Sequence, residues 1–172
     1  MNQTKLPPPD AAIKPLLAPF SDPDAVARYA EGPPRFVPGF ADLHGMTGIV
    51  LGERASADAR VLVLGAGGGL ELKALAAIHS GWRFVGVDPA PQMLRLAETM
   101  LGGHADRAEL IEGYIDDAPT GPFDAGLCLL TLHFLDAEER LRTLKEIRRR
   151  LSPGAPFVVA HSSFPQGPGE RA

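Results

Sequence analysis

The sequence has little cysteine, no large excess of charge of either sign and no long apolar run. One cysteine in 172 residues, Cys128, cannot form a disulfide within the chain. A net charge of −4 gives no general attraction to a nucleic-acid backbone. Charged residues, glycine or proline interrupt every hydrophobic stretch before the roughly 20 residues that a membrane-spanning helix needs. With no secretory signal pattern at the amino terminus, these absences predict a cytoplasmic protein without nucleic-acid or membrane partners.

The length fits one globular domain, and the first residues are rich in proline. Proline fixes the backbone and removes amide donors, which predicts a flexible arm over residues 1–20. Residues 21–172 are then expected to form a single domain that begins with a helical cap at about residues 21–57. The cap is predicted to contain a helix from Ser21 to Ala30, ended by Gly32-Pro33-Pro34, and a second helix over residues 39–57.

From about residue 60 to residue 161, short apolar runs alternate with helical patterns. A short run buried on both faces is typical of a strand in a parallel sheet. The expected strands are 61–64, 83–87, 108–112, 124–130 and 156–160, and the expected helices are 71–79, 89–101 and 137–151. This alternation predicts an α/β fold, a Rossmann-like doubly wound parallel sheet of about five strands with helices before it.

A glycine-rich loop follows the first expected strand. Gly65, Gly67 and Gly69 let the backbone approach a ligand closely, at the start of a helix whose free amides point toward it. The dinucleotide fingerprint needs a small residue three positions after its second glycine, and Leu70 stands there. The spacing therefore disfavours NAD, although a tight turn without any ligand remains an alternative.

Asp88 ends the second expected strand, 19 residues after Gly69. A carboxylate at this position can accept hydrogen bonds from the two hydroxyls of a ribose. The alternative is that Asp88 caps the helix expected from Pro89. The loop and the acid together predict a nucleoside-binding site.

The chain resembles the class I S-adenosylmethionine-dependent methyltransferases from Val61 to Ala160. The resemblance is carried by residues 61–69, 85–89 with Met93, 113–119, 123–124, 132–135 and 151–154. It implies that S-adenosylmethionine is the cofactor and that Asp88 holds its ribose. The cofactor-binding residues implied in this way are Gly65, Ala66, Gly67, Gly69, Asp88, Pro89, Met93, Tyr114, Ile115 and Leu129.

Two positions depart from that family. It often has an acid two residues before the first glycine, where this chain has Val63, and an aspartate where this chain has Tyr114. Recognition of the amino group of the cofactor is therefore expected to differ. Asp116 or Asp117 is a candidate for the contact with the adenine amine, and a solvated acidic loop is the alternative.

A narrower resemblance is to the carboxy-S-adenosylmethionine synthases. It rests on residues 37–40, 111–113 and 131–135. Phe40 and Leu129 stand where those enzymes have tyrosine and asparagine, so two polar cofactor contacts would be lost. This indicates shared ancestry rather than a shared reaction.

Methyl transfer needs an aligned acceptor more than a dedicated catalytic group. His133, after the fourth expected strand, is the candidate catalytic residue because a neutral imidazole can accept a proton, and a packed histidine is the alternative. Arg35 and Phe40 are candidate substrate-binding residues in the cap, together with Arg28 and Tyr29. Cys128 is expected to be a buried, inert thiol, Arg148–Arg150 to be the charged end of a helix, and no metal site is predicted.

Related methyltransferases continue with two further strands, and the residues after the fifth expected strand are too few for them. The fifth strand is therefore expected to be a sheet edge, which favours a homodimer through that edge. The predicted function is methyl transfer from S-adenosylmethionine to a small molecule. A non-catalytic S-adenosylmethionine- or nucleotide-binding protein and a carboxy-S-adenosylmethionine synthase-like enzyme are the alternatives.

Overall fold

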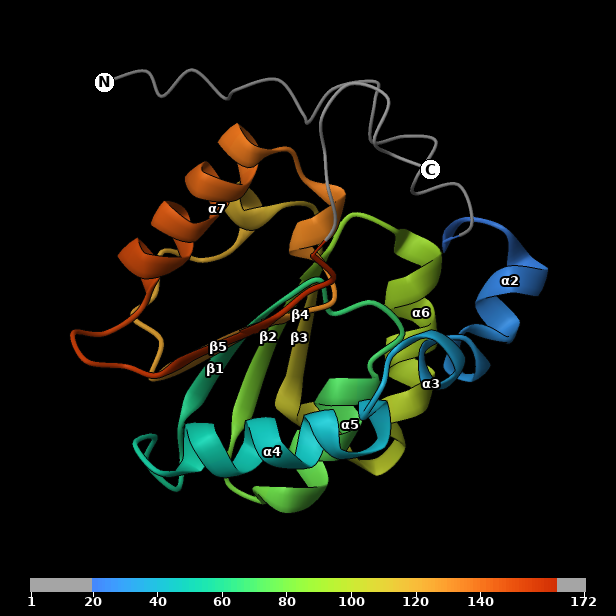
Figure 1. Cartoon of the computed structure of the whole chain (residues 1–172). Coiled ribbons are helices and arrows are strands. Elements are labelled where there is room, and N and C mark those ends of the chain that lie inside the picture. The colour runs from blue at the N-terminus through green and yellow to red at the C-terminus, as the bar shows by residue number, and fades with distance from the viewer. Residues whose placement is uncertain (1–19, 164–172) are drawn as a thin grey trace.

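The computed structural model describes residues 20–163, which form one parallel five-stranded sheet (Figure 1). The strands lie in the order β3-β2-β1-β4-β5, so the chain starts in the middle of the sheet and winds outward in both directions. Their bounds are β1 (Arg60–Leu64), β2 (Arg83–Asp88), β3 (Ala108–Glu112), β4 (Ala125–Leu129) and β5 (Phe157–Ala160). The expected doubly wound sheet is confirmed.

Successive residues of the strands point to opposite faces and build two apolar cores. Val61 and Val63 of β1 pack in one core with α4 (Phe40–Gly52) and α5 (Leu70–Ile78). Leu62 and Leu64 pack in the other core, together with Ile147 of α7 (Ala137–Arg150). Figure 1 shows α4, α5 and α6 (Pro91–Leu101) on one side of the sheet and α7 on the other. Burial on both faces explains why the strands read as continuous apolar runs.

The cap is more broken than its sequence pattern suggested. A short helix, α2 (Pro23–Ala27), is capped by Asp22, whose carboxylate accepts from the Ala25 amide at 2.8 Å. The helical segment ends at Gly32-Pro33-Pro34 as expected, but a further helix that the sequence did not predict, α3 (Pro33–Phe36), begins at the same prolines. Proline suits the first turn of a helix, since no amide is needed at that position. A 3-10 helix, η2 (Tyr29–Glu31), links α2 to α3.

The helix α4 keeps its two internal glycines, and one of them has a packing role. A Cβ on Gly48 would lie 3.2 Å from Leu75 and 3.3 Å from Ile78, both on α5. The missing side chain therefore lets the two helices approach closely, which offsets the low helix propensity of glycine.

The connections after β2, β3 and β4 each contain a short helical turn. These turns are η3 (Gly102–Arg107), η4 (Ile115–Asp117) and η5 (Leu132–Phe134). Arg107 joins η3 to the end of α5 by donating to the backbone oxygens of Ala76 and His79. Helices η4 and η5 follow β3 and β4 at the carboxyl edge of the sheet, and they are therefore placed beside the cavity described below.

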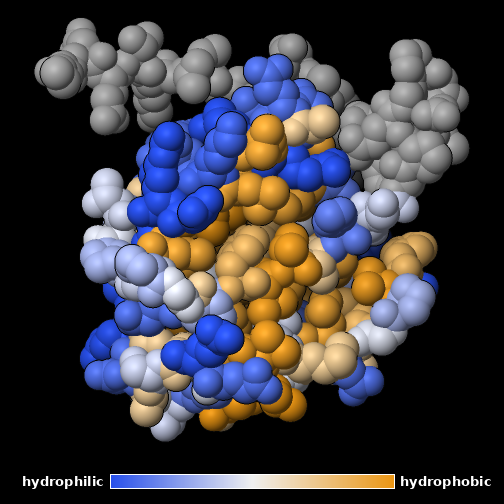
Figure 2. Space-filling view, turned by 60° about the vertical axis from the view of Figure 1, so that its left-hand side comes forward, coloured by the Kyte–Doolittle hydropathy of each residue, from blue (hydrophilic) through white to orange (hydrophobic). Residues whose placement is uncertain are grey.

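Within residues 20–163, β5 pairs only with β4 and leaves its other edge open. Val159 of β5 is 44% exposed, and Met46, Ile49 and Val50 of α4 are also exposed apolar residues. Figure 2 shows a face of the molecule on which apolar side chains form a band between hydrophilic ones. No helix in this part of the chain is long and apolar enough to cross a membrane. The expected arm lies almost wholly in residues 1–19, outside the described residues.

Candidate functional site

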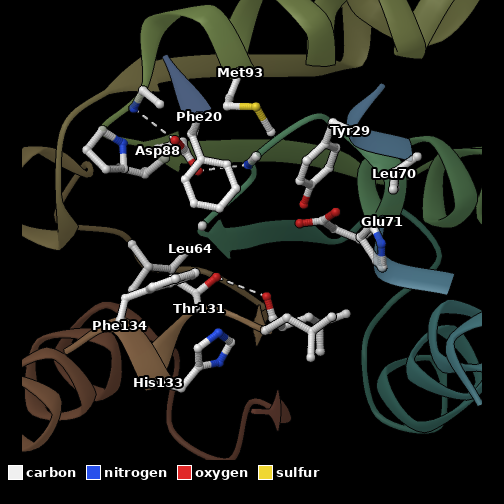
Figure 3. A pocket seen from close by; sticks show the side chains of 18 of the residues that line it. Phe20, Tyr29, Leu64, Leu70, Glu71, Asp88, Met93, Thr131, His133 and Phe134 are labelled. Atoms are coloured by element: carbon white, nitrogen blue, oxygen red, sulfur yellow. Dashed lines mark hydrogen bonds between the residues drawn. The ribbon is translucent and has the colours of Figure 1, made fainter. Parts of the chain in front are cut away.

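A cavity of about 660 Å³ opens at the carboxyl ends of β1, β2 and β4 (Figure 3). Leu64, Asp88 and Leu129, the last residues of these three strands, line it. The chain leaves β1 on one side and β4 on the other at this point, and open α/β sheets bind ligands where the strand order reverses in this way. The volume lies in the usual range for a small-molecule site, about 300–1,000 Å³.

The glycine loop forms one wall of the cavity. Gly65 and Gly69 have φ angles of 76° and 77°, which other residues rarely adopt. A Cβ on Gly65 would lie 2.6 Å from Cγ2 of Thr131, and a Cβ on Gly69 would lie 2.7 Å from Cα of Ala97 on α6. Gly65 therefore lets the loop pack under η5, whereas Gly69 lets α5 and α6 approach each other.

Asp88 fixes the loop to the end of β2. Its Oδ2 accepts from the Gly67 amide and its Oδ1 accepts from the Ala90 amide, each at 2.9 Å. Burial raises the pKa of Asp88, and these two amides act in the opposite direction. Ala90 is the N-cap of α6, so Asp88 supports the helix start as well as the loop. Each carboxylate oxygen has a lone pair left for a ligand in the cavity.

Aromatic side chains cover the cavity from the cap. Phe20 makes edge contacts with Tyr29 at 6.2 Å and with Phe134 of η5 at 5.7 Å between ring centroids. All three rings line the cavity, and Figure 3 shows the Tyr29 hydroxyl directed toward the carboxylate of Glu71. Burial and the neighbouring acids Glu71 and Asp88 raise the pKa of Tyr29, so its hydroxyl stays protonated at neutral pH. Sequence analysis had assigned Phe20 to the arm because of the prolines before it.

Glu71 is the functional candidate that sequence analysis missed. The sequence pattern identified Glu71 only as the first residue of the helix that follows the loop. Acids are common at that position because their negative charge interacts favourably with the helix dipole. The structure buries it to 8% exposure in the cavity wall. Burial and the charge of Asp88 raise the pKa of Glu71 to about 8. Only the three-dimensional packing of α5 against the cap reveals this.

His133 lies on η5 and lines the cavity from the side of β4. Its Nδ1 is buried and has no hydrogen-bond partner within residues 20–163. Burial, with His161 and Arg140 nearby, lowers the pKa of His133. The imidazole is therefore neutral at pH 7 and offers one ring nitrogen as an acceptor.

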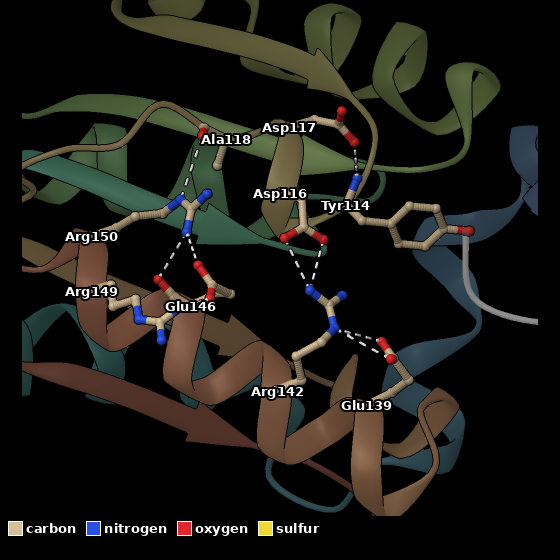
Figure 4. A network of polar contacts seen from close by, with 9 residues as sticks. All are labelled: Tyr114, Asp116, Asp117, Ala118, Glu139, Arg142, Glu146, Arg149 and Arg150. Atoms are coloured by element: carbon tan, nitrogen blue, oxygen red, sulfur yellow. Dashed lines mark hydrogen bonds and ion pairs between the residues drawn. The ribbon is translucent and has the colours of Figure 1, made fainter. Parts of the chain in front are cut away.

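The loop after β3 brings Tyr114 and the buried Ile115 to the cavity. The candidate acids Asp116 and Asp117 point elsewhere (Figure 4). Both oxygens of Asp116 accept from Nη1 of Arg142, at 3.0 and 2.8 Å, and Asp117 accepts from the Tyr114 amide at 3.0 Å. Neither acid lines the cavity. The sequence around Asp116 and Asp117 does not indicate that Arg142, 26 residues after Asp116, forms an ion pair with Asp116.

Figure 4 also shows how the arginines at the end of α7 are used. Arg149 pairs with Glu146, and the buried Arg150 pairs with the same acid at 2.8 Å while it contacts the Ala118 carbonyl. Two of the three arginines are therefore engaged within the chain. The expectation of a charged helix end agrees with this arrangement.

Most residues that sequence analysis assigned to the site surround this cavity. Those that line it are Gly65, Gly67, Asp88, Pro89, Met93, Tyr114, Ile115, Leu129, His133 and Phe40. Ala66 packs in the core, and Gly69 packs against α6. Arg35 is exposed, pairs with Glu31 at 3.5 Å and lies outside the main cavity. Cys128 is buried, and burial raises the pKa of its thiol to about 12.

A glycine loop held by a strand-end acid beside a covered cavity defines a nucleoside-binding α/β protein. Residues 61–154 match the methyltransferase domain family, and the chain belongs to that family. The expected membership of the class I methyltransferases is confirmed.

Relatives and solved structures support the same assignment. The chain is 31% identical over 145 residues to carboxy-S-adenosyl-L-methionine synthase of Chromohalobacter salexigens, covering 81% of this chain and 53% of that protein. The chain thus spans about half the length of the curated relatives it matches. An amino pentose methyltransferase of Micromonospora echinaspora, solved with S-adenosylmethionine bound, is 28% identical with a TM-score of 0.61, covering 72% of this chain and 51% of that one. The N-methyltransferase NodS of Bradyrhizobium japonicum, 18% identical with a TM-score of 0.66, covers 87% of this chain and 72% of that one and shows the fold.

Proposed function

We propose that the chain binds S-adenosylmethionine in the cavity and transfers its methyl group to a small-molecule acceptor. The observation that carries the proposal is the contact between Asp88 and the Gly67 amide, which joins the glycine loop to the strand-end acid at one ligand site. The family match and the neighbour solved with S-adenosylmethionine support the same cofactor. The cytoplasm is the proposed location, since it keeps a free thiol such as that of Cys128 reduced.

Different cavity residues contact different parts of such a ligand. Asp88 accepts from the ribose hydroxyls, and Tyr114 and Ile115 flank the adenine beside β3. The ligand then crosses the end of β1, where Gly65 and Gly67 line the cavity beside its methionine part. Pro89, Met93 and Leu129 supply apolar walls, which exclude water from the bound nucleoside.

The residues around the acceptor contribute position and a proton acceptor. When bound, the cofactor supplies an activated methyl group: the bond from methyl to sulfur breaks, its electron pair stays on sulfur, and a bond to the acceptor oxygen or nitrogen forms. His133 takes the proton that the acceptor loses, because its imidazole is neutral and its Nδ1 has no partner among the described residues. Phe40 lines the cavity and is the proposed substrate-binding residue of the cap, and Arg35, which lies beside Phe40 at a separate small pocket, is the second candidate.

Calorimetry tests the binding step. The wild type is expected to bind S-adenosylmethionine and S-adenosylhomocysteine and not NAD, and Asp88→Asn is expected to weaken both by tenfold or more, the usual range for a hydrogen bond to a charged group. Glu98→Gln, an exposed acid on α6, serves as the matched control and should bind like the wild type. A wild type that binds neither nucleoside would refute the proposal. Turnover is measured as S-adenosylhomocysteine formed with small alcohols, phenols and amines as acceptors.

A second candidate is a carboxy-S-adenosylmethionine synthase-like enzyme, favoured by the identity that extends over 81% of this chain. Against it, Phe40 and Leu129 line the cavity with apolar side chains where polar contacts are expected for that reaction. Mass spectrometry of nucleosides extracted from the purified protein separates the two. Methyl transfer predicts S-adenosylmethionine or S-adenosylhomocysteine, and the second candidate predicts the carboxylated nucleoside.

We also propose that two copies pair through the open edge of β5. A two-fold axis would place the two β5 strands antiparallel and would satisfy their outer amides and carbonyls. The same contact covers Val159, which is 44% exposed. Sedimentation should show a dimer whose dissociation constant rises in Val159→Lys. A wild type that sediments as a monomer at high concentration excludes this arrangement.

A further inference from the structure

One buried acid in the cavity has no role in the contacts described so far. Glu71 lies in the first turn of α5, directly after the glycine loop, and is 8% exposed. Its carboxylate bonds to its own backbone amide, and no lysine, arginine or histidine of residues 20–163 forms an ion pair with it. Figure 3 shows the carboxylate in the cavity wall beside the Tyr29 hydroxyl. The side chain is thus directed at the ligand space rather than at solvent.

This placement is costly for the ligand-free protein. Removing a carboxylate from water without a cationic partner is unfavourable, because the charged form loses its hydration. A second acid, Asp88, lines the same cavity and raises the pKa of Glu71, and both acids raise the pKa of Tyr29. A cation delivered by the ligand would remove this cost, and buried acids of this kind concentrate at functional sites.

The direction of the proposed ligand shows which of its groups reaches Glu71. With adenine at Tyr114 and ribose at Asp88, the ligand passes over Gly65 and Gly67 and ends near the start of α5. Val63, near the end of β1, is buried and apolar, so β1 supplies no acid there. The methionine part of the ligand carries an ammonium group at this end.

We infer that the carboxylate of Glu71 binds the α-ammonium group of the methionine part of the cofactor. This inference rests on the proposed function and deepens it, because it assigns the group that distinguishes S-adenosylmethionine from a simple nucleoside. Asp88 and Glu71 then divide the work: the first recognises the ribose and the second recognises the amino acid.

Three nucleosides and two acids test the assignment by calorimetry. S-Adenosylhomocysteine has the ammonium without a charged sulfur, S-adenosylmethionine has both, and 5′-methylthioadenosine has neither. Glu71→Gln is expected to weaken the first two by about tenfold to a hundredfold and to leave 5′-methylthioadenosine unchanged. Asp88→Asn is expected to weaken all three, and the exposed control Glu98→Gln none of them. Circular dichroism and urea unfolding verify that each variant is folded.

Each other result overturns the inference in a recognisable way. If Glu71→Gln binds S-adenosylmethionine more weakly but binds S-adenosylhomocysteine with unchanged affinity, Glu71 lies at the sulfonium. If the variant binds S-adenosylhomocysteine more tightly, Glu71 lies at the carboxylate of the ligand. If the variant loses as much affinity for 5′-methylthioadenosine as for the other two nucleosides, Glu71 is a structural residue. Failure of the wild type to bind any of the three refutes the proposed function itself, so the two failures are distinct.

The pH dependence of ligand affinity separates a ligand contact from a purely structural role of Glu71, because only a ligand contact would change it. Below pH 8 part of Glu71 is protonated in the free protein, and binding an ammonium requires that proton to leave. Affinity for S-adenosylhomocysteine should therefore increase from pH 6 to 8 in the wild type, and the increase should be absent in Glu71→Gln. The other titratable groups that line the cavity are Arg28, Tyr29, His44, Asp88, Tyr114, His133, Glu139 and Arg142, and the buried thiol of Cys128 on β4 also interacts electrostatically with Glu71. These groups remain in Glu71→Gln, so the difference between the two proteins isolates Glu71.

Discussion

Replacing Gly65 by alanine should destabilise the protein far more than a glycine-to-alanine change at a similar φ elsewhere. Two effects act together at this position. The φ of 76° costs an alanine roughly 1–2 kcal/mol. The new Cβ would also lie 2.6 Å from Cγ2 of Thr131 and closer still to its hydroxyl, and such overpacking typically costs about 1–3 kcal/mol. The expected loss in free energy of unfolding is therefore about 2–5 kcal/mol.

Gly154 supplies the control. Its φ is 81°, and nothing lies within 4 Å of the position its Cβ would take. Gly154→Ala should thus lose only the backbone part, about 1–2 kcal/mol. Urea unfolding of the ligand-free protein measures both variants, and adding Thr131→Ala to Gly65→Ala should recover part of the difference. Equal losses at the two glycines would refute the packing argument for the loop.

Three further predictions concern buried or paired groups. Cys128 should not react with an aromatic disulfide reagent in the native protein and should react after unfolding, because burial raises the pKa of its thiol to about 12. A double-mutant cycle with Arg142→Ala and Asp116→Asn should give a coupling of at most about 1 kcal/mol, since both side chains are partly exposed. A folded-state pKa of about 8 for Glu71 lies above its unfolded value, so the ligand-free wild type should lose stability relative to Glu71→Gln as pH rises from about 4 to 8. A wild type that gains stability over this range relative to Glu71→Gln would contradict the burial of the acid.

The sequence predicts the sheet and the centre of the site because both follow from local patterns. Apolar runs of four to six residues between helices leave few arrangements other than a doubly wound parallel sheet. Once β1 and β2 are neighbours, Gly67 and Asp88 must meet, because carboxyl ends of parallel strands share one edge. The hydrogen bond of 2.9 Å from the Gly67 amide to Asp88 is the contact that the spacing of these two residues in the sequence predicts.

The features that the sequence does not predict depend on contacts between distant segments. Asp116 has the pattern of a loop acid near the adenine, but Arg142 of α7 holds it outside the cavity. Phe20 follows a proline-rich stretch, yet its ring closes on Tyr29 and Phe134. The residue before a helix, or an acid in its first turn, has the same sequence pattern whether it faces solvent or a cavity.

The two acids of the cavity illustrate how a ligand-free protein can be prepared for a cation. Asp88 is satisfied before a ligand arrives, because two backbone amides of other residues donate to it. Glu71 has only its own amide, so most of its desolvation cost is not offset. A nucleoside with an ammonium group would relieve that cost, whereas one without it would not. We therefore expect Asp88 to position the nucleoside and Glu71 to select a nucleoside that carries an ammonium group.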